Sequence, residues 1–203
     1  MARAEGGSLA RVSMATPPPG WPSAVVLASS SPRRLDLLRS IGVDPEVRPA
    51  DIDETPFAGE EPDAYVARLA QGKAAAVAGP GEVVVAADTT VVIDGRIIGK
   101  PVDRASALAS LRALSGRTHT VFTGVAVLRA GGFAGATVTS EVTFVKASEE
   151  WLDWYTGTRE PYDKAGGYGL QGAGAMLVAS VNGSVSNVLG LPLAELNELM
   201  QSR

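Results

Sequence analysis

A run of three serines and two arginines follows an apolar stretch and precedes a helical pattern. Ser29-Ser30-Ser31-Pro32-Arg33-Arg34 comes directly after the apolar residues 24–28. The free N–H groups and partial positive charge at the start of a helix favour a phosphate, and guanidinium groups bind phosphate in bidentate fashion. The run therefore predicts an anion site, and the alternative is an N-cap serine followed by two solvated arginines. It is not a Walker A loop, because the Gly-x-x-x-x-Gly-Lys spacing is absent.

Carboxylates that could hold a divalent cation occur at two places. Asp51, Asp53 and Glu54 form an acidic group, and Asp88 ends the apolar run 83–87. Hydrolysis of a phosphoanhydride uses a divalent cation, and hard cations prefer carboxylate oxygens. Ligands collect at the carboxyl ends of strands in open α/β sheets, so Asp88 is predicted to hold a metal or to accept a proton from water. The alternatives are a solvated acidic loop and a capping aspartate.

Three basic residues lie where an anion could meet them. Lys73 is four residues from both Leu69 and Val77, so it shares their helix face. A lysine on an inward face either extends its ammonium group to solvent or meets an anion. Lys100 and Arg117 each follow a glycine beside a predicted turn. Solvated loop charges are the alternative for these two.

The glycine-rich stretch 163–172 could approach a ligand closely, because glycine frees the backbone. Gln171 within it offers both a donor pair and an acceptor, which suits the edge of a nucleobase. A mobile surface loop is the alternative. The aromatic cluster at 151–155 is predicted to pack on its own helix rather than to stack a base. His119 lies in an alternating strand and is predicted to be structural.

Composition narrows the class of protein. The chain has 203 residues, of which 45% are hydrophobic and 20% charged, as in an ordinary globular domain. A net charge of -4 argues against nucleic-acid binding, which needs a basic face. The absence of cysteine excludes disulfides, zinc–thiolate sites, iron–sulfur clusters and cysteine nucleophiles. A single histidine excludes a two-histidine metal motif.

Residues 1–22 are predicted to be a flexible, Pro-rich extension, and 23–203 the folded domain. The extension lacks the apolar region of a secretory signal, and Pro17-Pro18-Pro19-Gly20 cannot continue a helix. No apolar run approaches the roughly 20 residues that span a bilayer. We therefore expect a cytoplasmic protein without a membrane partner. The sequence leaves open whether Met1 or Met14 is the start, and whether the chain forms a homodimer.

Strands and helices that could position these residues alternate along the chain. Strands are expected at 24–28, 46–48 and 83–87, and helices at 32–41, 62–78, 103–114, 148–154 and 192–200. Hairpins are expected at 90–98 around Asp94-Gly95, at 118–146, and at 176–188 around Asn182-Gly183. Strands interleaved with helices and hairpins predict an α/β fold with a mixed sheet.

Several of these motifs together resemble the Maf family of nucleotide pyrophosphatases, in the family's order over about residues 24–200. The matching stretches are Leu27-Ala28-Ser29-Ser30-Ser31-Pro32-Arg33-Arg34, Ala87-Asp88-Thr89, Gly99-Lys100-Pro101, Leu114-Ser115-Gly116-Arg117-Thr118-His119, Asp163-Lys164-Ala165-Gly166, Tyr168-Gly169-Leu170-Gln171-Gly172 and Gly190-Leu191-Pro192. The resemblance implies a curved mixed β-sheet in two lobes around a central cleft, as in the related inosine triphosphatases. It also implies hydrolysis of nucleoside triphosphates to the monophosphate and pyrophosphate.

The resemblance implies a role for each matching residue. Asp88 corresponds to the proton acceptor, and Glu54 and Asp88 to the ligands of a divalent cation, Mg²⁺ or Mn²⁺. The triphosphate would be held by Ser29, Arg33, Arg34, Lys73 and Lys100, and the specificity positions would be Arg33, Thr89 and Gln171. The 163–171 segment is similar to the branch that prefers dTTP and UTP, and a house-cleaning role toward modified pyrimidine nucleotides follows. Gly167 departs from the bulkier residues frequent in relatives, which predicts a looser base pocket.

Two other functions share these motifs. A regulatory nucleotide-binding protein linked to septum formation would keep the phosphate loop but show little turnover. The presence of both acids, Glu54 and Asp88, favours catalysis over this regulatory role. A purine-directed pyrophosphatase would differ only in the base it accepts. Turnover of dTTP, UTP and ITP distinguishes these hypotheses.

Overall fold

The computed structural model describes residues 16–130 and 132–202. Most of the extension predicted over 1–22 therefore lies outside the described residues. Trp21, at its end, packs into the core with 8% of its surface exposed, and its Nε1 donates a hydrogen bond of 3.0 Å to Oδ1 of Asn197. The packed part of the chain thus begins before residue 23, because Trp21 buries a large apolar ring.

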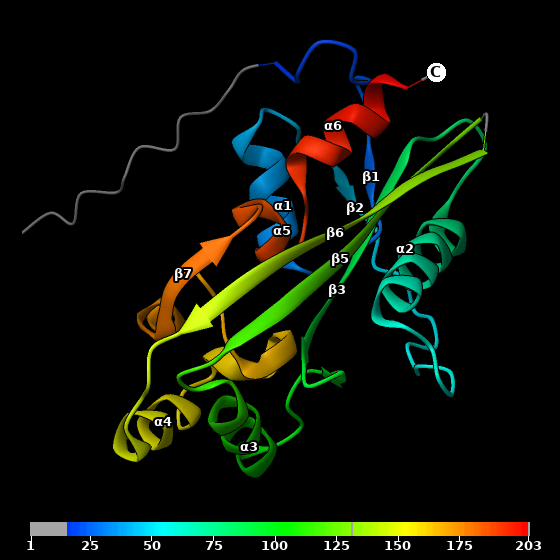
Figure 1. Ribbon diagram of the computed structural model, residues 1–203. Coiled ribbons are helices and arrows are strands. Elements are labelled where there is room, and N and C mark those ends of the chain that lie inside the picture. Colours follow the sequence, from blue (N-terminus) through cyan, green and yellow to red (C-terminus); the bar gives the residue numbers. More distant parts are fainter. Residues whose placement is uncertain (1–15, 131, 203) are drawn as a thin grey trace, which may run out of the picture.

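A single mixed sheet organises the protein (Figure 1). Its strands are β1 (Val26–Leu27), β2 (Glu46–Val47), β3 (Val84–Ile93), β4 (Arg96–Ile98), β5 (Thr118–Arg129), β6 (Gly132–Phe144) and β7 (Val178–Asn182). Their order is β2-β1-β3-β5-β6-β7, and β4 pairs with β3. β1 is parallel to β2 and β3, and every other pairing is antiparallel. The predicted mixed α/β sheet is confirmed.

Helices cover both faces of this sheet. They are α1 (Pro32–Ser40), α2 (Pro62–Val77), α3 (Arg104–Leu114), α4 (Glu149–Thr156), α5 (Val185–Val188) and α6 (Leu193–Gln201), with 3-10 segments η1 (Glu160–Asp163), η2 (Ala165–Gly167) and η3 (Ala173–Leu177). α2 lies on one face, and α1 and α6 lie on the opposite face (Figure 1). The predicted helices all form, and Asp103 caps α3 through a reciprocal capping box with Ser106.

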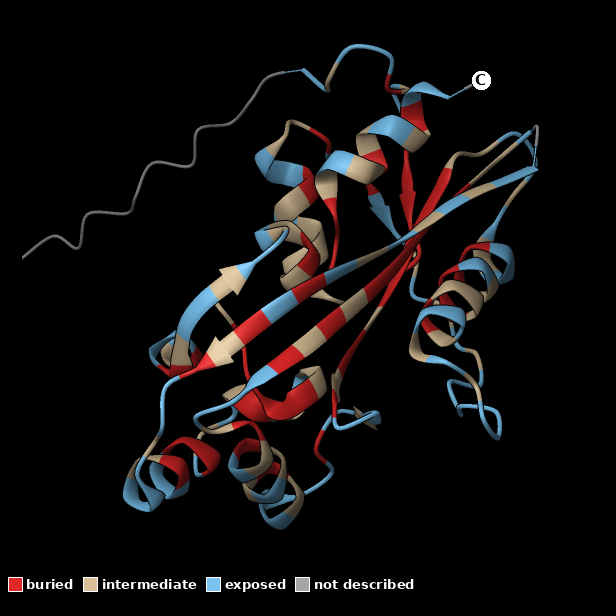
Figure 2. Ribbon diagram, in the orientation of Figure 1, coloured by how far each residue is buried: buried red, intermediate tan, exposed pale blue. Residues whose placement is uncertain are grey.

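The core divides into two main clusters, which correspond to the two predicted lobes. The first joins β1, α1 and α6 to Val85 and Ala87 of β3, and the second joins α3 and α4 to Val91 and Ile93 of the same strand. Figure 2 shows buried residues running along β3 and β5 from one lobe into the other. The two long strands therefore connect the lobes.

Successive residues of β3 face opposite sides of the sheet, as the pleat requires. Val85 and Ala87 pack toward α1 and α6, whereas Val84 and Ala86 pack with Ala74 of α2. The same alternation directs Asp88 toward α2.

Two predictions about strands were wrong. The strand predicted to stop at Asp88 continues to Ile93, because β5 pairs with it from Val84 to Val92 and supports the backbone beyond the apolar run. The second arm of the hairpin predicted at 176–188 is the helix α5, because Ser184 Oγ accepts a hydrogen bond from the Asn187 N–H and caps a helical turn. The hairpin at Asp94-Gly95 is confirmed, with positive φ at both residues as a primed turn requires.

No helix in the described ranges has the length and apolar character needed to cross a bilayer.

Candidate active site

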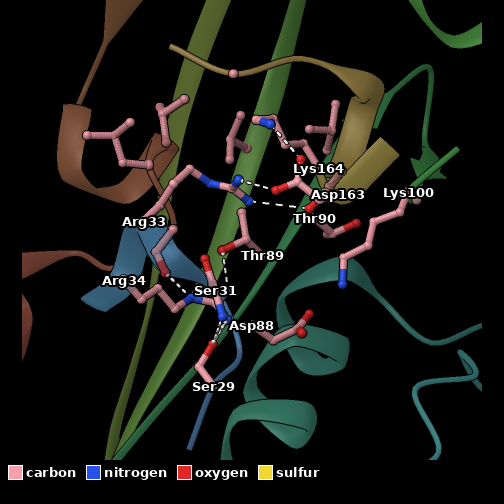
Figure 3. Close-up of a pocket in the computed structure, with 18 of the residues that line it drawn as sticks. Ser29, Ser31, Arg33, Arg34, Asp88, Thr89, Thr90, Lys100, Asp163 and Lys164 are labelled. Carbon is pink, nitrogen blue, oxygen red and sulfur yellow. Dashed lines mark hydrogen bonds and ion pairs between the residues drawn. The ribbon is translucent and has the colours of Figure 1, made fainter. Parts of the chain in front are cut away.

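A pocket of about 590 Å³ opens at the edge of β3 between β1 and β4 (Figure 3). β1 pairs with β3 at Val84 and Val85, and β4 pairs with it at Val91–Ile93. In the described part of the chain, neither strand covers the residues in between. This notch in the sheet is where the pocket forms, and Asp88, Thr89 and Thr90 line it.

The serine–arginine run forms one wall of this pocket. β1 ends at Leu27, and α1 begins at Pro32 with Ser31 as its N-cap, so the run connects a strand to a helix as predicted. The Ser31 side chain makes no capping hydrogen bond, while Ser29 Oγ accepts one of 3.2 Å from the Ser31 N–H. The N-terminal turn of α1 thus borders the pocket, where its unpaired N–H groups suit an anion.

Arg34 is built into the wall by three hydrogen bonds. Its Nε donates to the Gly190 carbonyl at 2.7 Å, and its two terminal nitrogens donate to Ser29 Oγ at 3.0 Å and Thr89 Oγ1 at 3.1 Å. Burial lowers the pKa of Arg34, and the charge of Asp88 opposes that shift. A guanidinium group nevertheless stays protonated in a protein. Arg34 therefore fixes three segments around the pocket and supplies a permanent positive charge.

Arg33 reaches across the pocket to the glycine-rich segment. Its guanidinium donates to Asp163 Oδ2 at 2.8 Å, and Lys164 Nζ lies 2.5 Å from the other carboxylate oxygen. Burial works to raise the pKa of Asp163, but hydrogen bonds from Lys164 and Arg33 outweigh it and lower the pKa overall. Asp163 and Lys164 were not predicted as site residues. Their place in the Asp-Lys-Ala-Gly motif was the available signal.

Lys73 joins the two predicted acids. Its Nζ lies 2.6 Å from Glu54 Oε1 and 2.6 Å from Asp88 Oδ1. Lys73 and Asp88 are both 7% exposed. Lys73 is buried because it shares the inward face of α2 with Leu69. Of the two outcomes predicted for this lysine, the structure shows the contact with anions, which are the Glu54 and Asp88 carboxylates. Partial burial opposes ionisation of Glu54, yet the hydrogen bond and charge of Lys73 lower the pKa of this carboxyl.

Gly124 allows α2 to come this close to the sheet. It lies opposite Asp88 in the β3–β5 register. A Cβ atom at Gly124 would stand 2.4 Å from the Val66 carbonyl oxygen. This oxygen belongs to the backbone of α2, so it cannot move away by a change of side-chain rotamer. The absence of a side chain here thus sets the distance between Lys73 and the strand that carries Asp88.

The two acids fit a divalent cation. Glu54 and Asp88 converge on one positive charge, the ammonium group of Lys73. Their oxygens are hard ligands, and Mg²⁺ usually takes one or two carboxylates together with water and substrate phosphates. No cluster of three or more His, Cys, Asp or Glu side chains suited to a metal occurs within residues 16–130 and 132–202. The donor set therefore suits a cation shared between the protein and a phosphate ligand.

The predicted substrate-binding residues gather here with one exception. Ser29, Arg33, Arg34, Lys73, Thr89 and Lys100 all line the pocket with Glu54 and Asp88. Gln171 is exposed and lies just beyond Leu170, the last residue of its segment in the wall. Asp51 and Asp53 are exposed and lie outside the lining.

Three further predictions concern residues outside the pocket. His119 is buried, with Nε2 at 2.7 Å from the Tyr168 hydroxyl, as a structural residue should be. A Cβ atom at Gly167 would stand 3.1 Å from Pro101 Cγ, and Gly167 is not part of the pocket wall. The looser base pocket predicted from Gly167 therefore has no counterpart at this position. The aromatic cluster packs on its own helix, where Trp151 stacks on buried Tyr155.

Fold and site together define an α/β protein in which a cationic loop and a carboxylate pair line one pocket. Such a pocket suits a phosphorylated ligand and a divalent cation. The model of the Maf-like protein family matches residues 24–203, and the chain belongs to this family.

Curated relatives agree over most of the chain. A dTTP/UTP pyrophosphatase of Anaeromyxobacter dehalogenans is 52% identical over 181 residues, which are 87% of this chain and 92% of the relative. A dTTP/UTP pyrophosphatase of Myxococcus xanthus is 51% identical over 180 residues, 87% of this chain and 91% of the relative. A dTTP/UTP pyrophosphatase of Exiguobacterium sibiricum is 48% identical over 179 residues, which are 88% of this chain and 91% of the relative.

Two solved structures share a more distant likeness. A nucleoside triphosphatase (dITP/XTP pyrophosphatase) of Mycobacterium abscessus aligns with a TM-score of 0.38 and 17% identity over 60% of this chain and 74% of its own. The Ham1 protein of Staphylococcus aureus aligns with a TM-score of 0.41 and 15% identity over 60% of this chain and 71% of its own.

Proposed function

We propose that this protein hydrolyses nucleoside triphosphates to the monophosphate and pyrophosphate, with dTTP and UTP as preferred substrates. The observation that carries the proposal is the pairing of Glu54 and Asp88 on Lys73, in the same pocket as Arg33, Arg34 and Lys100. The substrates are those in the names of relatives about half identical to this chain.

The basic wall accounts for binding of the triphosphate. The N-terminus of α1, Ser29 and the Arg33 side chain offer donors along one side of the pocket, and Lys100 offers an ammonium group on another. Arg34 adds a fixed charge behind Ser29. These donors match the several negative charges of a polyphosphate.

Asp88 is the general base of the proposed reaction. Its carboxylate accepts a proton from water as the water oxygen bonds to the α-phosphorus. The bond from the α-phosphorus to the bridging oxygen breaks, and that oxygen leaves with pyrophosphate. Lys73 and Lys100 stabilise the charge that develops on the leaving group. A divalent cation held by Glu54 and Asp88 would neutralise charge on the phosphate oxygens.

Preference for a pyrimidine is assigned to Arg33, Thr89 and Gln171. Arg33 and Thr89 already border the pocket. The Gln171 side chain would have to turn inward past Leu170 to meet a base. Hydrolysis of modified pyrimidine nucleotides by the same residues would keep these nucleotides out of nucleic acids.

A pyrophosphate-release screen tests the proposal. The parent protein is assayed with dTTP, UTP, a modified pyrimidine triphosphate and ITP, in Mg²⁺ or in Mn²⁺. We expect turnover of dTTP and UTP, and a loss of about 1,000-fold in Asp88→Asn. Near-parental turnover by a folded Asp88→Asn protein would refute the role of Asp88. Absence of pyrophosphate release from every nucleotide would refute the function itself.

A further inference from the structure

Part of the pocket wall is uncharged. The charged groups gather around the start of α1, around Lys73 and Lys100 and at Asp163–Lys164, whereas Tyr168, Gly169 and Leu170 form a stretch of wall without charge. If the function proposed above holds, the triphosphate binds at the charged groups, and the nucleoside faces this uncharged wall. The position of the 168–174 segment then determines which base fits.

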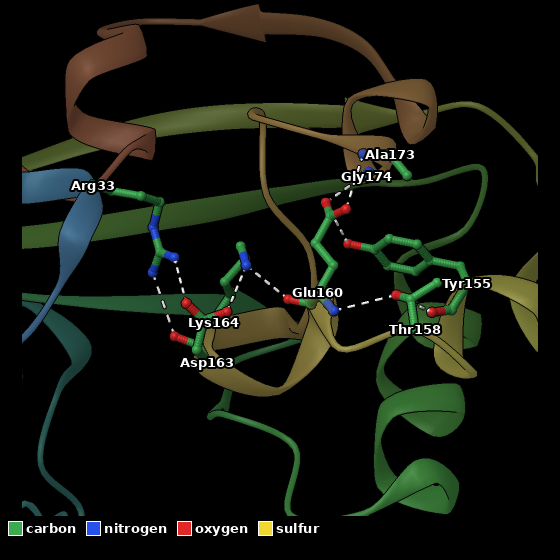
Figure 4. A network of polar contacts seen from close by, with 8 residues as sticks. All are labelled: Arg33, Tyr155, Thr158, Glu160, Asp163, Lys164, Ala173 and Gly174. Atoms are coloured by element: carbon green, nitrogen blue, oxygen red, sulfur yellow. Dashed lines mark hydrogen bonds and ion pairs between the residues drawn. The ribbon is translucent and has the colours of Figure 1, made fainter. Parts of the chain in front are cut away.

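Glu160 holds the far end of this segment (Figure 4). Its Oε2 accepts a hydrogen bond of 2.9 Å from the Ala173 N–H, and its Oε1 accepts one of 2.9 Å from the Gly174 N–H. The same Oε1 accepts a bond of 3.0 Å from the Tyr155 hydroxyl. One carboxylate thus ties η3 to α4. Hydrogen bonds to a charged acceptor are the stronger kind.

The backbone of Glu160 also holds Lys164, which precedes this segment in the chain. Lys164 Nζ donates to the Glu160 carbonyl at 2.7 Å and to Asp163 Oδ1 at 2.5 Å. Asp163 in turn holds Arg33 of α1 (Figure 4). Glu160 therefore holds η3 through its carboxylate and Lys164 through its carbonyl, and the chain of contacts continues through Asp163 to Arg33.

The 168–174 segment is closely packed against its neighbours. A Cβ atom at Gly174 would stand 2.6 Å from the Tyr155 hydroxyl oxygen and 2.7 Å from the Gly169 carbonyl oxygen. A Cβ atom at Gly172 would stand 2.8 Å from Glu160 Oε2. The carboxylate binds the backbone of Ala173 and Gly174, and Gly174 packs closely against Gly169 of the wall, so a change in the position of the carboxylate moves the wall.

We propose that Glu160 is a positioning residue for nucleobase selection, and that its carboxylate sets the place of the Tyr168–Leu170 wall without touching the substrate. This inference rests on the proposed function. It differs from a catalytic role because Asp88, Glu54 and Lys73 lie on or beside β3 and α2, away from the bonds that Glu160 makes.

Glu160→Gln tests the proposal with little change in shape. Only the amide oxygen of glutamine can accept hydrogen bonds, so the two backbone donors and Tyr155 cannot all be satisfied. We expect KM for dTTP and UTP to rise about 10-fold while kcat changes less than about 3-fold, because misplacement of a binding wall weakens binding before it affects the chemistry. The ratio of kcat/KM between dTTP and dCTP or dATP should fall by about 10-fold.

Two further variants complete the experiment. Glu198→Gln removes an exposed charge on α6 and should keep both KM and the nucleotide ratios of the parent. Tyr155→Phe leaves the carboxylate on its two backbone donors, and it should shift the ratios in the same direction by about 3-fold. Tyr155→Phe also tests the proposal if Glu160→Gln does not fold.

The outcomes separate the two proposals. A parent protein that releases no pyrophosphate contradicts the proposed function. An active parent whose nucleotide ratios persist in a folded Glu160→Gln protein, or in Tyr155→Phe where Glu160→Gln fails to fold, overturns the role of Glu160. A uniform fall in kcat with unchanged ratios also overturns it, because that pattern indicates a structural role only.

Discussion

Lys73 of α2 and Asp88 of β3 form a buried ion pair, with Nζ 2.6 Å from Oδ1. Glu54 brings a second carboxylate to the same ammonium group. Two acids beside one pocket repel each other, and the lysine between them offsets this repulsion. The arrangement keeps both carboxylates in place in the absence of a ligand.

Lys73→Met should therefore destabilise the protein. Removal of one partner leaves buried negative charge without compensation, which costs about 2 kcal/mol here because Glu54 is half exposed to water. Urea unfolding at neutral pH measures the loss. The matched variant Lys73→Met/Asp88→Asn removes the partner's charge as well and should regain part of the stability. A single variant as stable as the parent, or a double variant with no recovery, contradicts the role assigned to the lysine.

Gly124→Ala should weaken the same site from the neighbouring strand β5. The new Cβ would meet the Val66 carbonyl oxygen at 2.4 Å, so α2 must move away from β5. We expect a loss of at least about 2 kcal/mol in unfolding free energy and a parallel loss of turnover as Lys73 shifts. Gly99→Ala is the control for stability, because its Cβ meets no atom within 4 Å. Equal stability of the two variants would show that α2 does not depend on this contact.

Local patterns in the sequence were sufficient to predict the helices, and they indicated several of the residues that line the pocket. The helical spacing of Leu69, Lys73 and Val77 placed the lysine inward, where it meets Glu54 and Asp88. The serine–arginine run between an apolar stretch and a helix stripe located the loop at the pocket. These features depend on residues close together in the chain.

Features that depend on distant pairing were missed. The end of the apolar run at Asp88 predicted the end of the strand, but pairing with β5 extends it to Ile93. The partners of Arg34 include Gly190, 156 residues away, and no local pattern indicates that this arginine is built into the wall. Asp163 meets Arg33 across 130 residues for the same reason. The tract Pro17-Pro18-Pro19-Gly20 placed Trp21 in a flexible extension, although Trp21 packs against α6.

Trp21→Ala tests where the folded part begins. The ring is 8% exposed and its Nε1 bonds Asn197, so truncation should cost about 3 kcal/mol. Trp21→Phe keeps most of the apolar contact and loses the hydrogen bond, for about 1 kcal/mol. Trp154→Ala is a matched control, because this tryptophan is 54% exposed. If urea unfolding finds Trp21→Ala at least as stable as Trp154→Ala, Trp21 does not contribute to the core and belongs to the extension.

Acid should destabilise the protein in part through His119. Burial lowers the pKa of this imidazole from 6.5 to about 4, and the ring is 2% exposed, with edge contacts to Phe144 and Tyr168. Between these two pKa values the unfolded chain binds a proton that the folded protein does not. Stability is therefore complete above pH 6.5 and is lost as the pH falls toward 4, by about 2 kcal/mol at pH 5.

His119→Gln removes this titration and keeps an acceptor for the Tyr168 hydroxyl. The variant should be less stable than the parent at pH 7.5, since glutamine packs less well against two aromatic rings. On acidification to pH 5, however, it should lose about 2 kcal/mol less than the parent, because the carboxylates that also titrate are common to both proteins. Urea unfolding at pH 7.5, 6 and 5 provides the comparison. Parallel losses in the two proteins would mean that His119 takes up a proton in the folded state, and its assignment as a neutral structural residue would be wrong.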